Sequence, residues 1–97
     1  MAALSKILAM ERILADDMPK ENKVIRASQQ LSGLELTKLS ARIRKKIEKK
    51  FIFLNSILMQ YPIKTFEDYG QIIPEHLEQM IQTLSQICQI LKLSNTD

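Results

Sequence analysis

Hydrophobic side chains recur every three or four residues along most of the chain, which is the spacing of one face of an α-helix. The first stretch covers about residues 2–15 and ends before Pro19, a residue that suits the first turn of a second helix over residues 20–31. Ser32 and Gly33 favour a break after that helix. A single glycine costs a helix only about 1 kcal/mol, so a continuous helix through Gly33 is the alternative.

The longest stretch covers about residues 34–60 and ends at Tyr61 and Pro62. Its hydrophobic stripe consists of Leu36, Leu39, Ile43, Ile47, Phe51, Leu54 and Leu58. A short helical turn capped by Thr65 is expected over residues 65–69, and a fourth helix over residues 74–93 opens with Pro74. The stripe of the fourth helix consists of Leu77, Met80, Leu84, Ile87 and Leu91. Together these segments predict one all-α domain over residues 1–97, an antiparallel bundle of three to four helices with long third and fourth helices.

Composition supports the same fold class. Two glycines and three prolines in 97 residues are too few for an all-β sandwich or barrel, which needs a turn about every 8–12 residues. No apolar run approaches the roughly 18 residues of a transmembrane helix. The single cysteine, Cys88, cannot form an internal disulfide. We therefore expect a soluble intracellular protein, cytoplasmic or nuclear.

Residues for catalysis are scarce. His76 and Cys88 are the only residues of their types and lie twelve positions apart on the predicted fourth helix, about 18 Å by the helical rise, which is too far for a catalytic pair. The two glycines, at positions 33 and 70, cannot form a phosphate-binding loop. The sequence thus predicts a protein that is not an enzyme, with no catalytic residues, no metal site, no cofactor and no small-molecule substrate.

The net charge of +3 is distributed unevenly. Residues 35–60 hold seven bases and two acids (+5), whereas residues 61–97 hold two bases and five acids (−3). Lys38, Arg42, Lys45 and Lys49 share one face of the predicted third helix. This basic face is a solvated surface, a partner of the acidic C-terminal third, or a contact site for nucleic acid, an acidic protein or a lipid surface. No stacking aromatic lies among the bases, which argues against nucleic acid.

The third and fourth helices carry more apolar or uncharged surface than a monomer needs. Residues 51–54 are all apolar and so point in every direction around a helix, and residues 79–91 contain no charge. One interpretation is that the fourth helix is central in the bundle; the other is that both helices pack on a partner chain. The interface residues predicted on the second interpretation are Phe51, Ile52, Phe53, Met59, Gln82, Gln86, Gln89, Ile90 and Leu93.

These observations predict a non-enzymatic interaction subunit, adaptor or regulator. It would dock on a protein partner, or oligomerise, through its third and fourth helices. One alternative is a nucleic-acid-binding protein that uses the basic face of the third helix. Another is a small immunity or regulatory factor that binds one target protein. In size, charge and helix number the chain is similar to bacteriocin immunity proteins, although no motif of that family matches it residue by residue.

Overall fold

The helices expected from the hydrophobic spacing are present in the computed structural model, which describes residues 2–34 and 39–94, residues 2–4 by their backbone alone. The α-helices are α1 (Ala2–Ala15), α2 (Lys20–Ser32), α3 (Ala41–Leu58) and α4 (Pro74–Ser94), and a 3₁₀ helix, η2 (Phe66–Gln71), lies between α3 and α4. No β-strand occurs in the described segments. The all-α helical bundle predicted from the sequence is confirmed.

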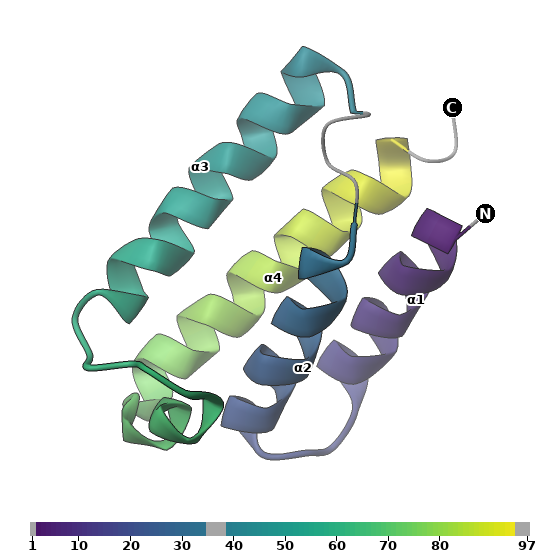
Figure 1. Cartoon of the computed structure of the whole chain (residues 1–97). Helices are drawn as coiled ribbons and strands as arrows, with labels where there is room; N and C mark the ends of the chain where they lie inside the picture. Colours follow the sequence, from purple (N-terminus) through teal and green to yellow (C-terminus); the bar gives the residue numbers. More distant parts are fainter. Residues whose placement is uncertain (1, 35–38, 95–97) are drawn as a thin grey trace.

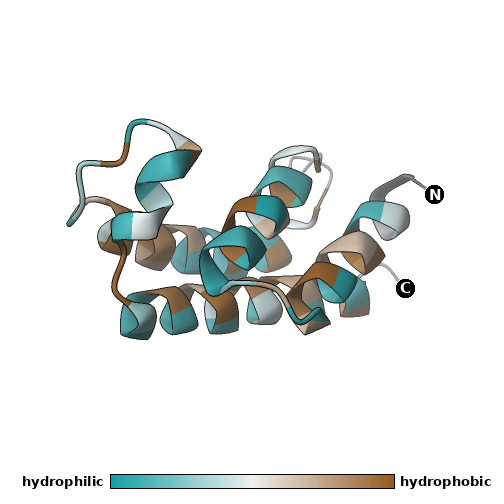
Figure 2. Ribbon diagram, turned by 90° about the horizontal axis from the view of Figure 1, so that it is seen from below, coloured by the Kyte–Doolittle hydropathy of each residue, from teal (hydrophilic) through white to brown (hydrophobic). Residues whose placement is uncertain are grey.

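The helices run in alternating directions, and α4 lies in the middle of the bundle (Figure 1). It packs against α1, α2 and α3, whereas α1 and α3 lie at opposite edges. Hydrophobic residues alternate with hydrophilic ones along each helix, as Figure 2 shows by its change of colour from turn to turn. Each helix can therefore bury one side and expose the other, and α4, which has three neighbours, buries the most.

The core follows the stripes read from the sequence. All five residues of the predicted α4 stripe are buried: Leu77, Met80, Leu84, Ile87 and Leu91. The largest side chains with almost no exposed surface also include Met10 of α1, Val24 of α2 and Ile47 of α3, so every α-helix contributes to one core. Full burial of such a side chain stabilises the fold by about 1.5–3 kcal/mol.

The third helix starts later than expected. The sequence predicts a helix from residue 34, which is wrong: Leu34, Leu39 and Ser40 are not helical, and residues 35–38 lie outside the described segments. Ser40 has extended backbone angles, and its Oγ accepts a hydrogen bond from the Ile43 N–H at 3.4 Å, which caps α3. Leu39 packs at the edge of the core without being helical. The spacing of apolar residues by three or four therefore begins before the helix itself begins.

The ends of α1, α2 and α4 lie within one residue of their predicted positions, whereas α3 and η2 end two residues away from theirs, at Leu58 and Gln71. Gly33 directly follows Ser32, the last residue of α2, so the helix ends where the sequence predicts a break. The Gly33 N–H donates to the Gln30 carbonyl at 3.2 Å. The turn expected over residues 65–69 is η2, which follows Thr65. The Asp68 carboxylate accepts hydrogen bonds from the backbone N–H groups of Lys64 (2.7 Å) and Thr65 (3.0 Å), which fixes the entry to this helix.

Candidate protein-interaction surface

The outward side of α3 exposes large hydrophobic side chains. Ile52 is 68% exposed, Phe53 42% and Met59 85%, although the same helix buries Ile47 and Leu54. Each residue of an α-helix advances by about 100°. Ile52 and Met59, seven residues apart, therefore lie on one line along the helix, and Phe53 lies beside that line. All three belong to the interface predicted from the sequence.

The position of α3 at the edge of the bundle explains this exposure. Its main neighbour among the described elements is α4, so one side of the helix is covered and the opposite side faces solvent. Residues 51–63 contain no charged side chain, which leaves the C-terminal half of this solvent-facing side uncharged. Large contiguous exposed apolar patches, rather than single exposed apolar residues, are typical of contact sites.

The N-terminal half of α3 is basic. Arg42, Lys45 and Lys49 are all exposed, and none of their side chains has an ion pair or a hydrogen bond within the segments that the structure describes. Lys38, the fourth residue of the predicted basic face, lies outside the described segments. We call the surface formed by Arg42, Lys45, Lys49, Ile52, Phe53 and Met59 the outer face of α3.

The predicted interface residues of α4 divide into two groups. Gln86 accepts a hydrogen bond from Lys50 Nζ at 2.7 Å, which ties α4 to α3. Phe53 lies three residues beyond Lys50 and so on nearly the same side of α3, which places the Phe53 side of the outer face of α3 next to Gln86. Gln89, in contrast, lines a pocket on the α1 side of the helix. Gln82, Gln86 and Gln89 are all exposed and, at a spacing of four and three residues, lie on one side of α4, between its contacts with α3 and α1.

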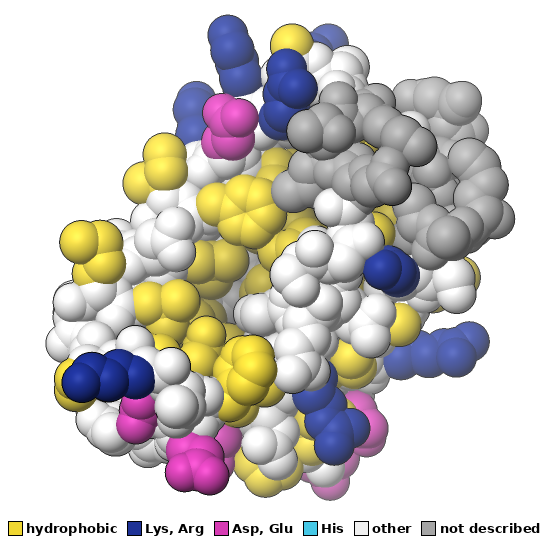
Figure 3. Space-filling view, viewed as in Figure 1, with side chains coloured by type: hydrophobic (Ala, Val, Ile, Leu, Met, Phe, Trp, Pro, Cys, Tyr) yellow, Lys and Arg dark blue, Asp and Glu magenta, His cyan; other side chains and the backbone are white. Residues whose placement is uncertain are grey.

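The remaining predicted residues differ in exposure. Gln82 and Leu93 are exposed, as an interface requires of the free chain. Phe51 and Ile90 are half-buried and pack against the core, so they lie at the margin of the surface. Figure 3 shows hydrophobic side chains gathered between α3 and α2, over the central helix α4.

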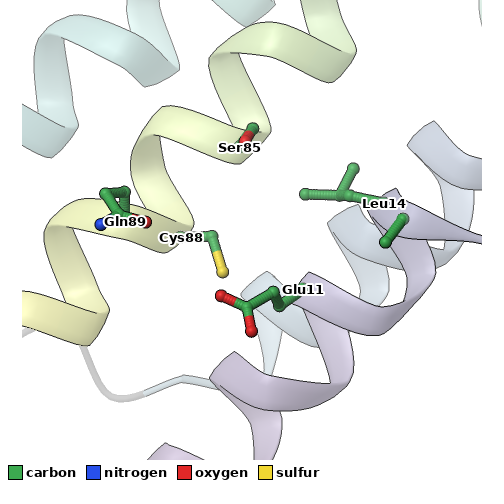
Figure 4. Close-up of a pocket in the computed structure, with 6 residues that line it drawn as sticks. Glu11, Leu14, Ser85, Cys88 and Gln89 are labelled. Carbon is green, nitrogen blue, oxygen red and sulfur yellow. The ribbon is translucent and has the colours of Figure 1, made fainter.

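A pocket of about 200 Å³ lies between α1 and α4 and is lined by Glu11, Leu14, Ala15, Ser85, Cys88 and Gln89 (Figure 4). The Cys88 Sγ donates to the Ile7 carbonyl at 3.4 Å. Burial raises the pKa of this thiol, the nearby Glu11 carboxylate raises it further, and Lys92 opposes both effects. The thiol therefore stays protonated near neutral pH and is a poor nucleophile.

The charged groups beside this pocket neutralise each other. Lys92 Nζ lies 2.9 Å from Glu11 Oε2, in an ion pair that joins α4 to α1.

His76 lies in the first turn of α4, and its Nδ1 shares a hydrogen bond of 2.7 Å with the Tyr61 hydroxyl. The same hydroxyl also accepts a hydrogen bond from the Ile73 N–H at 3.3 Å. Cys88 thus bonds α4 to α1, and His76 bonds the first turn of α4 to Tyr61 in the connection after α3.

Two exposed apolar residues were not predicted from the sequence. Phe66 of η2 is 51% exposed, and Ile73, just before α4, is 46% exposed. Both lie among acidic residues, since Glu67 follows Phe66 and Glu75 lies two positions after Ile73. The exposure of Ile73 could have been expected from the sequence, because two adjacent isoleucines in a short connection do not both point to the core. Ile72 is the buried one of the two.

The described residues contain neither a cluster of metal ligands nor a membrane-spanning helix. Within residues 2–34 and 39–94, no three His, Cys, Asp or Glu side chains are grouped so that they could hold a metal ion. None of the helices described there combines the length and hydrophobicity needed to cross a membrane. The chain matches no known family model, no curated protein and no solved structure.

Proposed function

We propose that this chain is a non-catalytic protein-interaction module that docks on a protein partner through the outer face of α3. It would serve as a subunit, adaptor or regulator of a complex. The observation that carries this proposal is the exposure of Ile52 and Met59 on a line directly beyond an unpaired basic stretch. We give α4 a smaller part, in which Gln82 and Gln86 border the Phe53 side of the contact.

The physical reason is the hydrophobic free energy that this surface retains. Burying an Ile, Phe or Met side chain completely is worth about 1.5–3 kcal/mol, and Ile52 and Met59 keep at least two thirds of their surface in water. Interface centres are enriched in aromatic residues, Met and Arg, the types that occur on the outer face of α3. The central position of α4 accounts for the apolar stripe that it buries, whereas the uncharged glutamines of the same stretch are exposed.

Site-specific photo-crosslinking in cells that produce the protein tests this proposal. A photoreactive amino acid replaces Ile52 in one variant and Met59 in another, and the matched control carries it at Gln29, an exposed residue of α2. We expect a discrete protein adduct from positions 52 and 59 and none from position 29. Equal labelling at all three positions, or no adduct at all, contradicts the proposal.

A second variant separates loss of binding from loss of folding. Ile52→Glu combined with Met59→Glu should leave the helical circular dichroism unchanged, because both side chains are mostly in solvent. The same double change should remove the adduct formed from a photoreactive residue at position 53. Persistence of that adduct would show that the outer face of α3 is not the contact surface.

The unpaired bases also support the second candidate, a nucleic-acid-binding protein. Phosphate contacts by Arg42, Lys45 and Lys49 would make binding of a nucleic-acid duplex fall steeply with salt, and charge reversal of the three residues would abolish it. A titration of a labelled duplex in low and high salt decides this case. We extend the main proposal to a cytoplasmic or nuclear location, which suits the free, buried Cys88 thiol.

A further inference from the structure

The two ends of the bundle carry opposite charge. Lys and Arg side chains gather at the N-terminal end of α3, with one acidic side chain among them, whereas Asp and Glu lie mainly at the other end of the molecule (Figure 3). Some bases lie at this second end as well, and Lys20 forms an ion pair with Glu78 there at 3.1 Å. The acidic end contains η2 and the start of α4, with Glu67 and Glu75 both exposed. In residues 60–78, Lys64 is the only Lys or Arg, against four acids.

The exposed apolar residues lie between and within these charged regions. Along α3 the order is bases, then Ile52 and Met59, and the acidic η2 lies beyond the end of the helix (Figure 1). Phe66 and Ile73 are exposed within the acidic region itself. The surface therefore runs from basic through apolar to acidic in the direction of α3.

From this order we infer that the partner of the outer face of α3 is a second copy of this chain, bound antiparallel about a twofold axis. This inference rests on the proposed function, because it names the partner of the same surface. In an antiparallel pair the apolar centres meet, and each basic half lies opposite the acidic end of the other copy. A parallel pair would place bases against bases, which is unfavourable.

The dimensions of α3 agree with this register. Ile52 and Met59 are about 10 Å apart along the helix axis, and Lys45 lies about 16 Å from the midpoint between them. A point 16 Å from this midpoint in the opposite direction lies beyond Leu58, the last residue of α3, in the region of the following connection and η2. Ile52 of one copy would then face Met59 of the other, and Lys45 and Lys49 would face the region of Glu67.

Sedimentation equilibrium of the purified full chain tests the inference. We expect a monomer–dimer equilibrium between about 10 µM and 1 mM, as a contact along one helix lies at the small end of specific interfaces. Raising the salt concentration should weaken the dimer, because its charge contacts are exposed. A chain that stays monomeric up to about 1 mM at low salt overturns the inference.

A charge swap tests the antiparallel arrangement. One variant carries Lys45→Glu and Lys49→Glu, and the other carries Glu67→Lys and Glu75→Lys. Each variant alone should dimerise at least tenfold more weakly, since both contacts of its dimer become repulsive. An equal mixture should restore dimers near the wild-type affinity, because every contact is again between opposite charges. A mixture that does not recover overturns the arrangement, as does a wild-type affinity in either variant alone.

The control variant carries Arg12→Glu and Arg26→Glu, two charge reversals at exposed residues of α1 and α2. It should dimerise like the wild type, and circular dichroism verifies that all variants fold. The outcomes also separate this inference from the proposed function. A monomeric chain that is still crosslinked through position 52 to a different protein keeps the proposed function and refutes the second copy as partner.

Discussion

Two isoleucines at opposite extremes of exposure provide the sharpest test of the fold. Ile87 of α4 is completely buried, and Ile52 of α3 is 68% exposed. Each is changed to alanine, which removes the same three carbon groups, worth about 2.4 kcal/mol at 0.8 kcal/mol each when fully buried. Any difference between the two variants therefore reports the surroundings of the side chain and not its chemistry.

The expected magnitudes follow from these exposures. Ile87→Ala should lower the free energy of unfolding by about 4 kcal/mol, because a cavity in a packed core adds to the lost transfer energy. Ile52→Ala loses only about a third of the transfer energy, about 0.8 kcal/mol, and the better helix propensity of alanine returns a few tenths of that. We expect a net loss of about 0.5 kcal/mol for Ile52→Ala.

Urea unfolding followed by circular dichroism measures both variants at low protein concentration, where self-association does not contribute. With a slope of about 1.5 kcal/mol per molar urea, Ile87→Ala should lower the midpoint by about 2–3 M and Ile52→Ala by about 0.3 M. Equal shifts in the two variants would refute the central position of α4 and the edge position of α3 together.

Three further substitutions and one measurement of thiol reactivity test local features of the fold. Tyr61→Phe removes the hydroxyl that bonds His76 and should lower the free energy of unfolding by about 1–2 kcal/mol in urea. Ser40→Ala removes the α3 cap and should cost about 0.5–1 kcal/mol by the same method, since its hydrogen bond is long. The backbone N–H groups of Lys64 and Thr65 lower the pKa of Asp68. The carboxylate therefore stabilises the fold above its ordinary pKa of about 3.9, and this contribution is lost as the pH falls through the lower pKa of the folded state. Asp68→Asn should remove this pH dependence from the acid side of the stability curve. Cys88 should react with iodoacetamide much more slowly than a free thiol at neutral pH, and a rate equal to that of a free thiol would contradict its burial.

The central position of α4 explains why α3 exposes hydrophobic side chains. In a bundle whose helices each touch two neighbours, every helix has a similar exposed fraction. Here α4 takes three neighbours and α3 lies at the edge, so α3 exposes hydrophobic residues that a more enclosed helix would bury. The same geometry leaves Arg42, Lys45 and Lys49 in solvent without partners among the described residues.

The helices themselves were predictable from the sequence because their signals are local. Pro19 and Pro74 mark helix starts, Gly33 marks a stop, and the stripe from Leu77 to Leu91 is buried as its spacing predicts. The exposure of Ile52 and Phe53 was also predictable, since four consecutive apolar residues cannot all face one side of a helix. These features depend on residues a few positions apart and on the geometry of a single helix.

Tertiary packing decided the rest. Leu39 continues the helical spacing, and only the cap at Ser40 and the packing of the bundle show that α3 starts after it. The sequence pattern of the uncharged stretch in α4 does not show where this helix lies, and only its contacts with three helices place it in the centre of the bundle. Gln86 bonds Lys50, a residue 36 positions away, and Cys88 bonds a carbonyl 81 positions away. Helical periodicity shows which side of a helix is apolar, but which neighbour covers that side depends on contacts between residues distant in the chain.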